Sequence, residues 1–157
     1  FKIEGRAKSA YYVSVVTNAY RMALDYLKDH KDNFVLPDYI RDEVFKVSHR
    51  SYCTGFFFGH PKDCQYYENS GYIREYDVVA VIDECKDGYL YCSQRNKFSV
   101  GDTVEILSPL QKPYEMKITE ILDEKGEKLE NACHAEMKFR IPCDKIFTNN
   151  SIIRMKK

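Results

Sequence analysis

The repeat length of the apolar residues changes once along the chain, and this change limits the folds that the sequence can adopt. Between Lys8 and His30, apolar residues recur every three or four positions, which is the period of an amphipathic helix. The predicted apolar face consists of Tyr12, Val16, Ala19, Tyr20, Ala23 and Leu27. After Tyr72, apolar and polar residues alternate, which is typical of strands. We therefore predict an α+β fold in which helices precede a sheet.

The helical region is expected to need tertiary contacts. Ser9 is placed to cap the first helix, but a cluster of β-branched residues, Val13 to Thr17, lowers its intrinsic helix propensity. Pro37 and Asp38 signal a shorter second helix. Residues 48–72 contain several glycines around Phe56–Phe58 and are predicted to be an irregular linker. We place the domain boundary there, with a helical part and linker at 1–72 and a β-barrel domain at 73–157.

The second part contains several short strand patterns separated by turn residues. A hairpin is predicted around Lys86-Asp87-Gly88, and further alternating segments lie near residues 103–107, 114–118, 137–141 and 152–155. In the segment 103–107, Val104 and Ile106 should face inward, and Gly101 before it should adopt a positive φ. This spacing predicts a small antiparallel β-barrel of five to seven strands, closed because open edges invite aggregation.

Composition excludes some classes of protein. Lys plus Arg and Asp plus Glu number 24 each, so no global field attracts a polyanion. No apolar run approaches the roughly 20 residues of a membrane span. The six cysteines contain no CxxC pair and are expected to be reduced thiols rather than metal ligands, which favours a cytoplasmic protein without a metal or cofactor. The chain opens at Phe1 without a secretory signal, so it is expected to begin inside an element of a larger protein.

Four charged residues lie just before the first helix, namely Lys2, Glu4, Arg6 and Lys8. Charges between a strand end and a helix start are where α/β barrels hold substrates, since a helix N-terminus favours anions. The alternative is a solvated loop, because charged residues are surface residues by default.

Three motifs resemble the collagenase-like peptidase family U-32. Lys2-Ile3-Glu4-Gly5-Arg6, followed by Lys8-Ser9, resembles the end of the family's catalytic domain. Tyr52–Gly59 is similar to its aromatic-rich linker, and Arg95-Asn96-Lys97-Phe98 with Val100-Gly101-Asp102 is similar to its C-terminal segment. Residues 98–106 also resemble the second-domain barrels of translation GTPases, which supports a barrel.

The family resemblance implies that 1–72 is a helical remnant of a catalytic domain and that 73–157 is an accessory barrel. Glu4 and Arg6 become candidate catalytic residues, and Lys2 and Lys8 candidate substrate ligands. The family's cysteine-rich signature is absent, so no ligand role passes to the cysteines of this chain, which should be inactive by itself. An iron–sulfur cluster is possible in the upstream part of the parent, whose catalytic domain is the expected partner.

Family members act either as proteases or in pyrimidine hydroxylation of tRNA or ribosomal RNA, and the residues leave both open. The leading hypothesis is a substrate-positioning domain of a protease. The runner-up is an RNA-engaging domain, in which Tyr89 or Tyr91 stacks on bases. Its candidate basic residues are Arg95, Lys97, Lys138, Arg140, Arg154, Lys156 and Lys157. A third hypothesis is a purely structural module with an ordinary mixed-charge surface.

Overall fold

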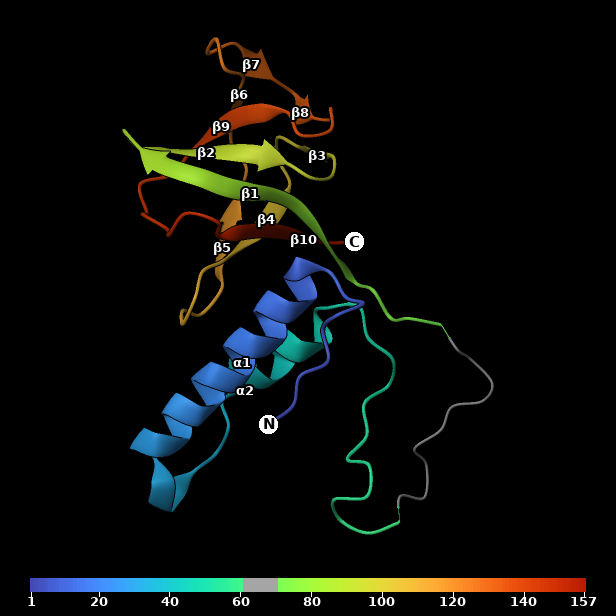
Figure 1. The fold of residues 1–157 in the computed structure, drawn as a ribbon. Coiled ribbons are helices and arrows are strands. Elements are labelled where there is room, and N and C mark those ends of the chain that lie inside the picture. Colours follow the sequence, from blue (N-terminus) through green and yellow to red (C-terminus); the bar gives the residue numbers. More distant parts are fainter. Residues whose placement is uncertain (61–70) are drawn as a thin grey trace.

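The computed structural model describes residues 1–60 and 71–157, with helices first and strands after them (Figure 1). The long helix α1 spans Ala10–Asp29, and the Ser9 side chain accepts a hydrogen bond from the Tyr12 backbone N–H. The predicted cap is therefore confirmed. Three short elements follow, namely η1 (Lys31–Asn33), α2 (Asp38–Arg41) and η2 (Asp42–Phe45). Of the predicted linker, the segment 61–70 lies outside the described residues.

The strands form an eight-stranded antiparallel sheet with the order β5-β4-β10-β1-β2-β9-β6-β7, beside a two-stranded sheet of β3 and β8. The strands are β1 (Tyr76–Lys86), β2 (Tyr89–Gln94), β3 (Phe98–Ser99), β4 (Thr103–Leu107), β5 (Tyr114–Lys117), β6 (Ile121–Leu122), β7 (Lys128–Leu129), β8 (Asn131–Ala132), β9 (Lys138–Pro142) and β10 (Ile152–Lys156). The predicted α+β class is confirmed.

The described part of the chain has more strands than the five to seven expected. The additional strands β3, β6, β7 and β8 have two residues each, too few for an alternating pattern to be recognised in the sequence. Nor does hydrogen bonding close the described sheet, because β5 and β7 stand at opposite ends of the strand order. The sheet is curled like a half-barrel.

The predicted turns and inward residues are confirmed. The β1–β2 hairpin turns at Asp87 and Gly88, whose φ angles are 51° and 76°. Gly101 has a φ of 98°, a conformation that β-branched residues avoid. Val104 and Ile106 are both buried.

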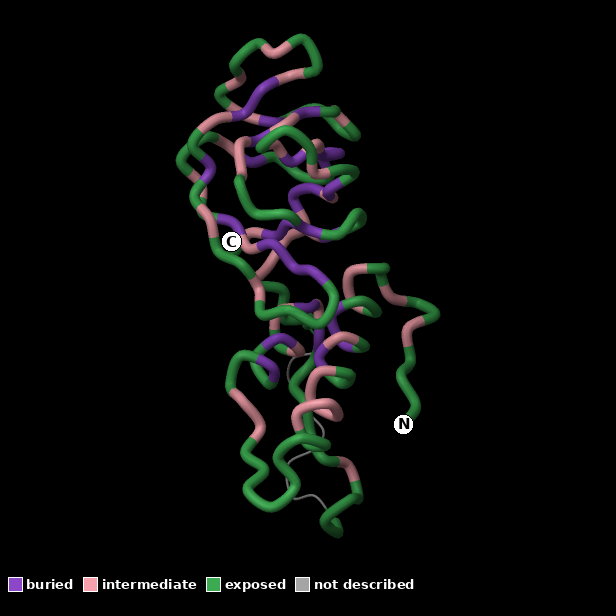
Figure 2. The backbone as a smooth tube through the Cα atoms, turned by 90° about the vertical axis from the view of Figure 1, so that its left-hand side faces the viewer, coloured by how far each residue is buried: buried purple, intermediate pink, exposed green. Residues whose placement is uncertain are grey.

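Buried segments concentrate within the curled sheet (Figure 2). There Phe98 and Phe139 pack with aliphatic residues of most strands and form the main core. A smaller apolar cluster joins the helices to the sheet through Val15, Val16, Val47 and Leu107. The helices thus lie on the side of the sheet that carries β4, β5 and β10 (Figure 1).

The buried face of α1 differs from the predicted one. Tyr20 and Leu27 are exposed, whereas Val15 is buried with Val16 and Ala19. The reason is that only the N-terminal half of α1 reaches the sheet, so its second half has little to pack against (Figure 2). No helix among the described residues is both long and apolar enough to cross a membrane.

Candidate functional site

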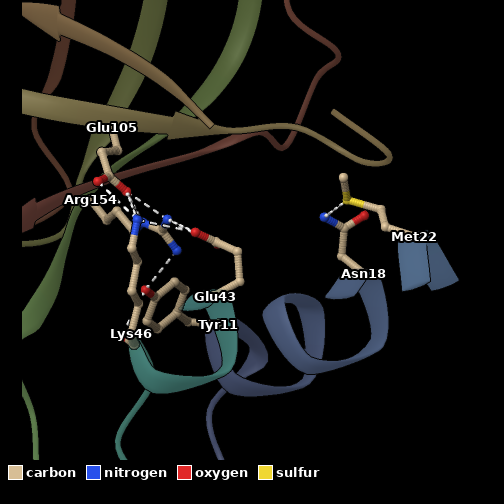
Figure 3. A network of polar contacts seen from close by, with 7 residues as sticks. All are labelled: Tyr11, Asn18, Met22, Glu43, Lys46, Glu105 and Arg154. Atoms are coloured by element: carbon tan, nitrogen blue, oxygen red, sulfur yellow. Dashed lines mark hydrogen bonds and ion pairs between the residues drawn. The ribbon is translucent and has the colours of Figure 1, made fainter. Parts of the chain in front are cut away.

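A buried cluster of charged residues joins the helices to the sheet. Arg154 of β10 is fully buried, and its guanidinium donates to Glu43 Oε1 at 2.6 Å and to Glu105 Oε2 at 2.6 Å (Figure 3). Lys46 Nζ lies 3.0 Å from both oxygens of Glu105. The Tyr11 hydroxyl accepts from Arg154 at 3.3 Å and donates to the Lys46 backbone oxygen. The charges of two carboxylates and two cations therefore balance. We call this set the junction cluster; it consists of Tyr11, Glu43, Lys46, Glu105 and Arg154.

Opposite charges in the junction cluster shift the pKa values of Glu105 and Arg154. Burial opposes the charge on Glu105, but the neighbouring Arg154 and Lys46 outweigh it and lower the pKa of Glu105 below its usual value. Burial likewise opposes the charge on Arg154, yet its hydrogen bond to Glu43 and the nearby negative charges raise its pKa. The pKa of Tyr11 is raised chiefly by burial. Glu105 and Arg154 thus keep the charges that hold the two halves together.

The prediction that Arg154 belongs to an outward basic patch is wrong. Alternation along β10 leaves Lys156 exposed, but Arg154 is covered by Glu43 and Tyr11 from the helical part. Two-residue periodicity cannot indicate that a helix covers one position of a strand.

A groove of about 540 Å³ opens beside the junction cluster, where the start of α1 meets the start of β1. We call it the junction groove. It is lined by Ala7, Lys8, Ser9, Tyr11, Tyr12, Ser48, Tyr72, Arg74, Tyr76, Val78 and Asn96. Four of these residues are tyrosines, two are cationic and none is acidic. The groove therefore combines aromatic surface with positive charge.

Two cations lie against tyrosine rings of the junction groove, namely Lys8 of its lining and Arg50 beside it. Lys8 Nζ lies 4.3 Å from the centroid of the Tyr72 ring and 5.3 Å from that of Tyr12. The Arg50 guanidinium carbon lies 5.1 Å from the Tyr72 centroid. Among the described residues, neither Lys8 nor Arg50 forms an ion pair with a carboxylate, whereas Arg74 pairs with Asp77. Lys8 and Arg50 are thus available to an incoming anion.

The groove brings together parts of two predicted motifs that lie about 90 residues apart. Lys8 and Ser9 come from the first motif, and Asn96 comes from the Arg95-Asn96-Lys97-Phe98 segment. The Asn96 side-chain amide donates to the Val78 backbone oxygen at 2.7 Å, which holds this segment against β1. Arg95 and Lys97 flank Asn96 and are exposed.

The other charged residues of the first motif lie outside the groove lining. Lys2 and Glu4 form an exposed ion pair with each other at 3.1 Å, and Arg6 is exposed. Their roles as substrate ligand and catalytic candidates stay predictions.

Lys138 and Arg140 lie elsewhere, on a surface that we call the β2–β9 face. It consists of Tyr89, Tyr91 and Ser93 of β2 with Lys138 and Arg140 of β9. Arg140 lies 5.1 Å and 5.9 Å from the ring centroids of Tyr89 and Tyr91, so a cation lies beside both tyrosines that were predicted to stack on bases. However, Lys138 is bound by Asp83 at 3.0 Å, and Asp123 and Glu124 line the adjoining cavity of about 310 Å³.

Sequence reasoning missed Tyr72, Arg50, Arg74 and Tyr76 as site residues. These residues occur near the linker, where no periodic pattern singles them out. The one usable signal was the density of tyrosine between Arg50 and Tyr76.

The sequence matches one protein family in both halves. The family model described as the peptidase family U32 C-terminal domain matches residues 74–154. The model described as peptidase family U32 matches residues 1–66. The chain therefore belongs to peptidase family U32, and the resemblance seen in its motifs is confirmed.

Relatives of this chain carry two kinds of name. A tRNA hydroxylation protein P1 of Bacillus subtilis is 32% identical over 99% of this chain and 38% of its own length. An uncharacterized protease of Methanocaldococcus jannaschii is 34% identical over 68% of this chain and 28% of its own length. The chain thus spans well under half of these relatives.

A solved structure is also similar. It is the C-terminal domain of a Geobacillus thermoleovorans protein assigned to the U32 peptidases, with 24% identity and a TM-score of 0.48 over 50% of this chain and 98% of that one.

Proposed function

We propose that this chain is the RNA-engaging C-terminal part of a U32-family protein that acts in tRNA hydroxylation, and that tRNA binds across the junction groove. The observation that carries the proposal is the groove lining, in which four tyrosines and Lys8 occur without a carboxylate, with Arg50 beside the Tyr72 ring. The name of the Bacillus subtilis relative, which matches 99% of this chain, supports tRNA as the substrate.

Charge around the groove favours a polyanion despite the neutral composition of the chain. Binding to nucleic acid depends on local cations that replace the counterions of phosphates, rather than on net charge. Lys8, Arg50, Arg95 and Lys97 have no carboxylate ion-pair partner among the described residues, and they lie in or next to the groove lining or against its rings. The N-terminus of the 20-residue helix α1 also borders the groove, and its first turn has no acidic residue.

The test is equilibrium binding of labelled tRNA to the 157-residue chain over a series of salt concentrations. We expect the affinity to fall with salt, with a slope of roughly −0.9 per phosphate neutralised in duplex regions. Lys8→Glu should weaken binding about tenfold, because it places a negative charge in the groove. Undetectable or salt-insensitive binding would remove the proposal.

The matched control is Lys31→Glu. Lys31 is an exposed lysine just beyond the C-terminal end of α1, about 30 Å along the helix from the groove. This variant has the same change in net charge as Lys8→Glu and should bind tRNA as the unmodified chain does. Equal losses in both variants would indicate a nonspecific charge effect and contradict the assignment to the groove.

A second candidate function is peptide positioning, which a different groove favours. A groove of about 400 Å³ lies between α1 and the β4–β5 connection, and its apolar lining includes Val13, Leu107, Pro109, Leu110 and Ile152. The relative named a protease fits this candidate. Binding of gelatin peptides that is abolished by Leu110→Asp and unaffected by Lys8→Glu would support it.

Catalysis is assigned to neither groove. We expect the chain alone to show no peptide cleavage and no RNA modification, with the catalytic domain of the parent as its partner and as the location of any iron–sulfur cluster. In that parent, Glu4→Ala or Arg6→Ala should lower activity without loss of barrel stability.

A further inference from the structure

Tyr72 differs from the other tyrosines of the junction groove in its exposure. Tyr72 is 53% exposed, whereas Tyr11, Tyr12 and Tyr76 are of intermediate exposure. Tyr11 is also fixed by hydrogen bonds to Arg154 and Lys46 (Figure 3). Tyr72 is therefore the ring at the rim that a ligand meets first, and Tyr11 belongs to the rigid base of the groove.

The cations beside Tyr72 suit a ligand that has both an aromatic and an anionic part. Lys8 and Arg50 both lie within about 5 Å of this ring, so an anion that binds them is placed next to an aromatic face. A nucleotide has this combination, because each base is attached to a phosphodiester. The groove volume of about 540 Å³ lies within the roughly 300–1,000 Å³ typical of sites for small ligands.

We propose that the junction groove binds unpaired nucleotides of RNA, with Tyr72 stacking on a base and Lys8 and Arg50 binding the adjacent phosphates. The proposal rests on the proposed function and specifies which part of an RNA the groove accepts. A base within a duplex has both faces covered by its neighbours, so only an unpaired base can stack on a tyrosine ring. A duplex would contact the groove through phosphates alone.

The junction cluster fixes the width of the groove before a ligand binds. Lys8 and Tyr12 belong to the helical side and Tyr76 and Asn96 to the sheet side, so the groove width depends on how the two parts are held together. Arg154 ties Glu43 of η2 to Glu105 of β4 with its side chain fully buried (Figure 3). A groove fixed before binding loses less conformational freedom when the ligand binds.

The experiment compares three labelled RNAs by fluorescence anisotropy, namely tRNA, a single-stranded octamer and the same octamer in a duplex. We expect the single strand to bind about tenfold more tightly than the duplex. Tyr72→Leu should weaken single-strand binding about tenfold, because stacking is typically worth roughly five- to a hundredfold per base. Tyr72→Phe, which keeps the ring, should retain binding.

The chain offers a matched control in Tyr114. Lys145 Nζ lies 4.4 Å from the Tyr114 centroid, nearly the distance between Lys8 and Tyr72, but Tyr114 does not line the junction groove. Tyr114→Leu should leave the affinity for single-stranded RNA unchanged. Thermal melts of each variant provide the folding control.

The outcomes separate the two proposals. Equal affinity for single strand and duplex, or equal losses in Tyr72→Leu and Tyr114→Leu, overturns the nucleotide assignment even where tRNA binds. Tight single-strand binding that depends on Tyr72, combined with undetectable tRNA binding, supports the groove assignment and overturns the proposed function.

Discussion

The junction groove and the β2–β9 face contain the same residue types, but they differ in what surrounds their cations. At the groove, Lys8 of the lining and Arg50 beside it lie against Tyr72 without a carboxylate ion-pair partner among the described residues. On the face, Lys138 is paired with Asp83, and three carboxylates line the adjoining cavity. A cation that is already paired with a carboxylate binds a phosphate only weakly. The residue types alone therefore do not define a nucleic-acid site, because the neighbours of each cation determine whether it can bind a phosphate.

The two regions also differ in how they depend on buried charge. The groove lies beside the junction cluster, whose Glu43 and Arg154 are buried. The ion pair of the β2–β9 face is exposed, with side-chain exposures of 54% for Lys138 and 40% for Asp83. Buried ion pairs are costly to break, whereas exposed pairs contribute little.

The largest loss of stability is therefore expected for Arg154→Met. This change leaves Glu43 and Glu105 without their main partner and should lower the free energy of unfolding by about 3–5 kcal/mol. Urea denaturation measures it. The comparison variant Lys138→Met should cost below about 1 kcal/mol, since its ion pair is exposed. Similar losses in both variants would contradict the distinction between the two regions.

Gly101→Val should have the next largest effect, at a position that lines neither the junction groove nor the cavity of the β2–β9 face. Gly101 has a φ of 98° and no heavy atom within 4 Å of an added Cβ, so the cost comes from backbone conformation and not from a clash. We expect a loss of about 1 kcal/mol or more, with RNA affinity unchanged in the folded protein. Unaltered stability in thermal melts would show that the turn tolerates a β-branched residue.

A smaller loss of stability is expected at low pH, and it tests the difference in burial between the junction cluster and the β2–β9 face. The pKa of Glu105 is lowered in the folded protein, because its cationic partners outweigh its burial. Its ionisation therefore stabilises the fold above its ordinary pKa near 4.5, and this contribution is lost as the pH falls through the lower, folded-state pKa. In urea titrations, Glu105→Gln should show a weaker decline of stability below pH 4.5 than the unmodified chain. Parallel declines would exclude Glu105 as a contributor.

The smallest effect is expected on the β2–β9 face. Arg140→Glu should reduce tRNA affinity by less than about threefold, because the carboxylates around this face already disfavour a polyanion. The same binding assay applied to Lys8→Glu supplies the comparison. A larger loss at Arg140 than at Lys8 would transfer the main RNA contact to the face.

By itself, the sequence determined the order of helices and strands, the Ser9 cap, the β1–β2 hairpin and the positive φ at Gly101. These features depend on residues close together in the chain, through periodicity, capping and turn preferences. The family motifs likewise indicated the U32 family, which the family models match.

Only the tertiary structure decided which charged residues are available. Arg154 and Arg140 both occur in alternating strand patterns, yet a helical segment buries the first, while the second remains partly exposed beside two tyrosines. The junction groove is also a tertiary feature, because it joins residues of the first motif to Tyr72 and Asn96. Local patterns indicate which face of an element a side chain occupies, but burial and ion pairing depend on which distant segment packs against that face.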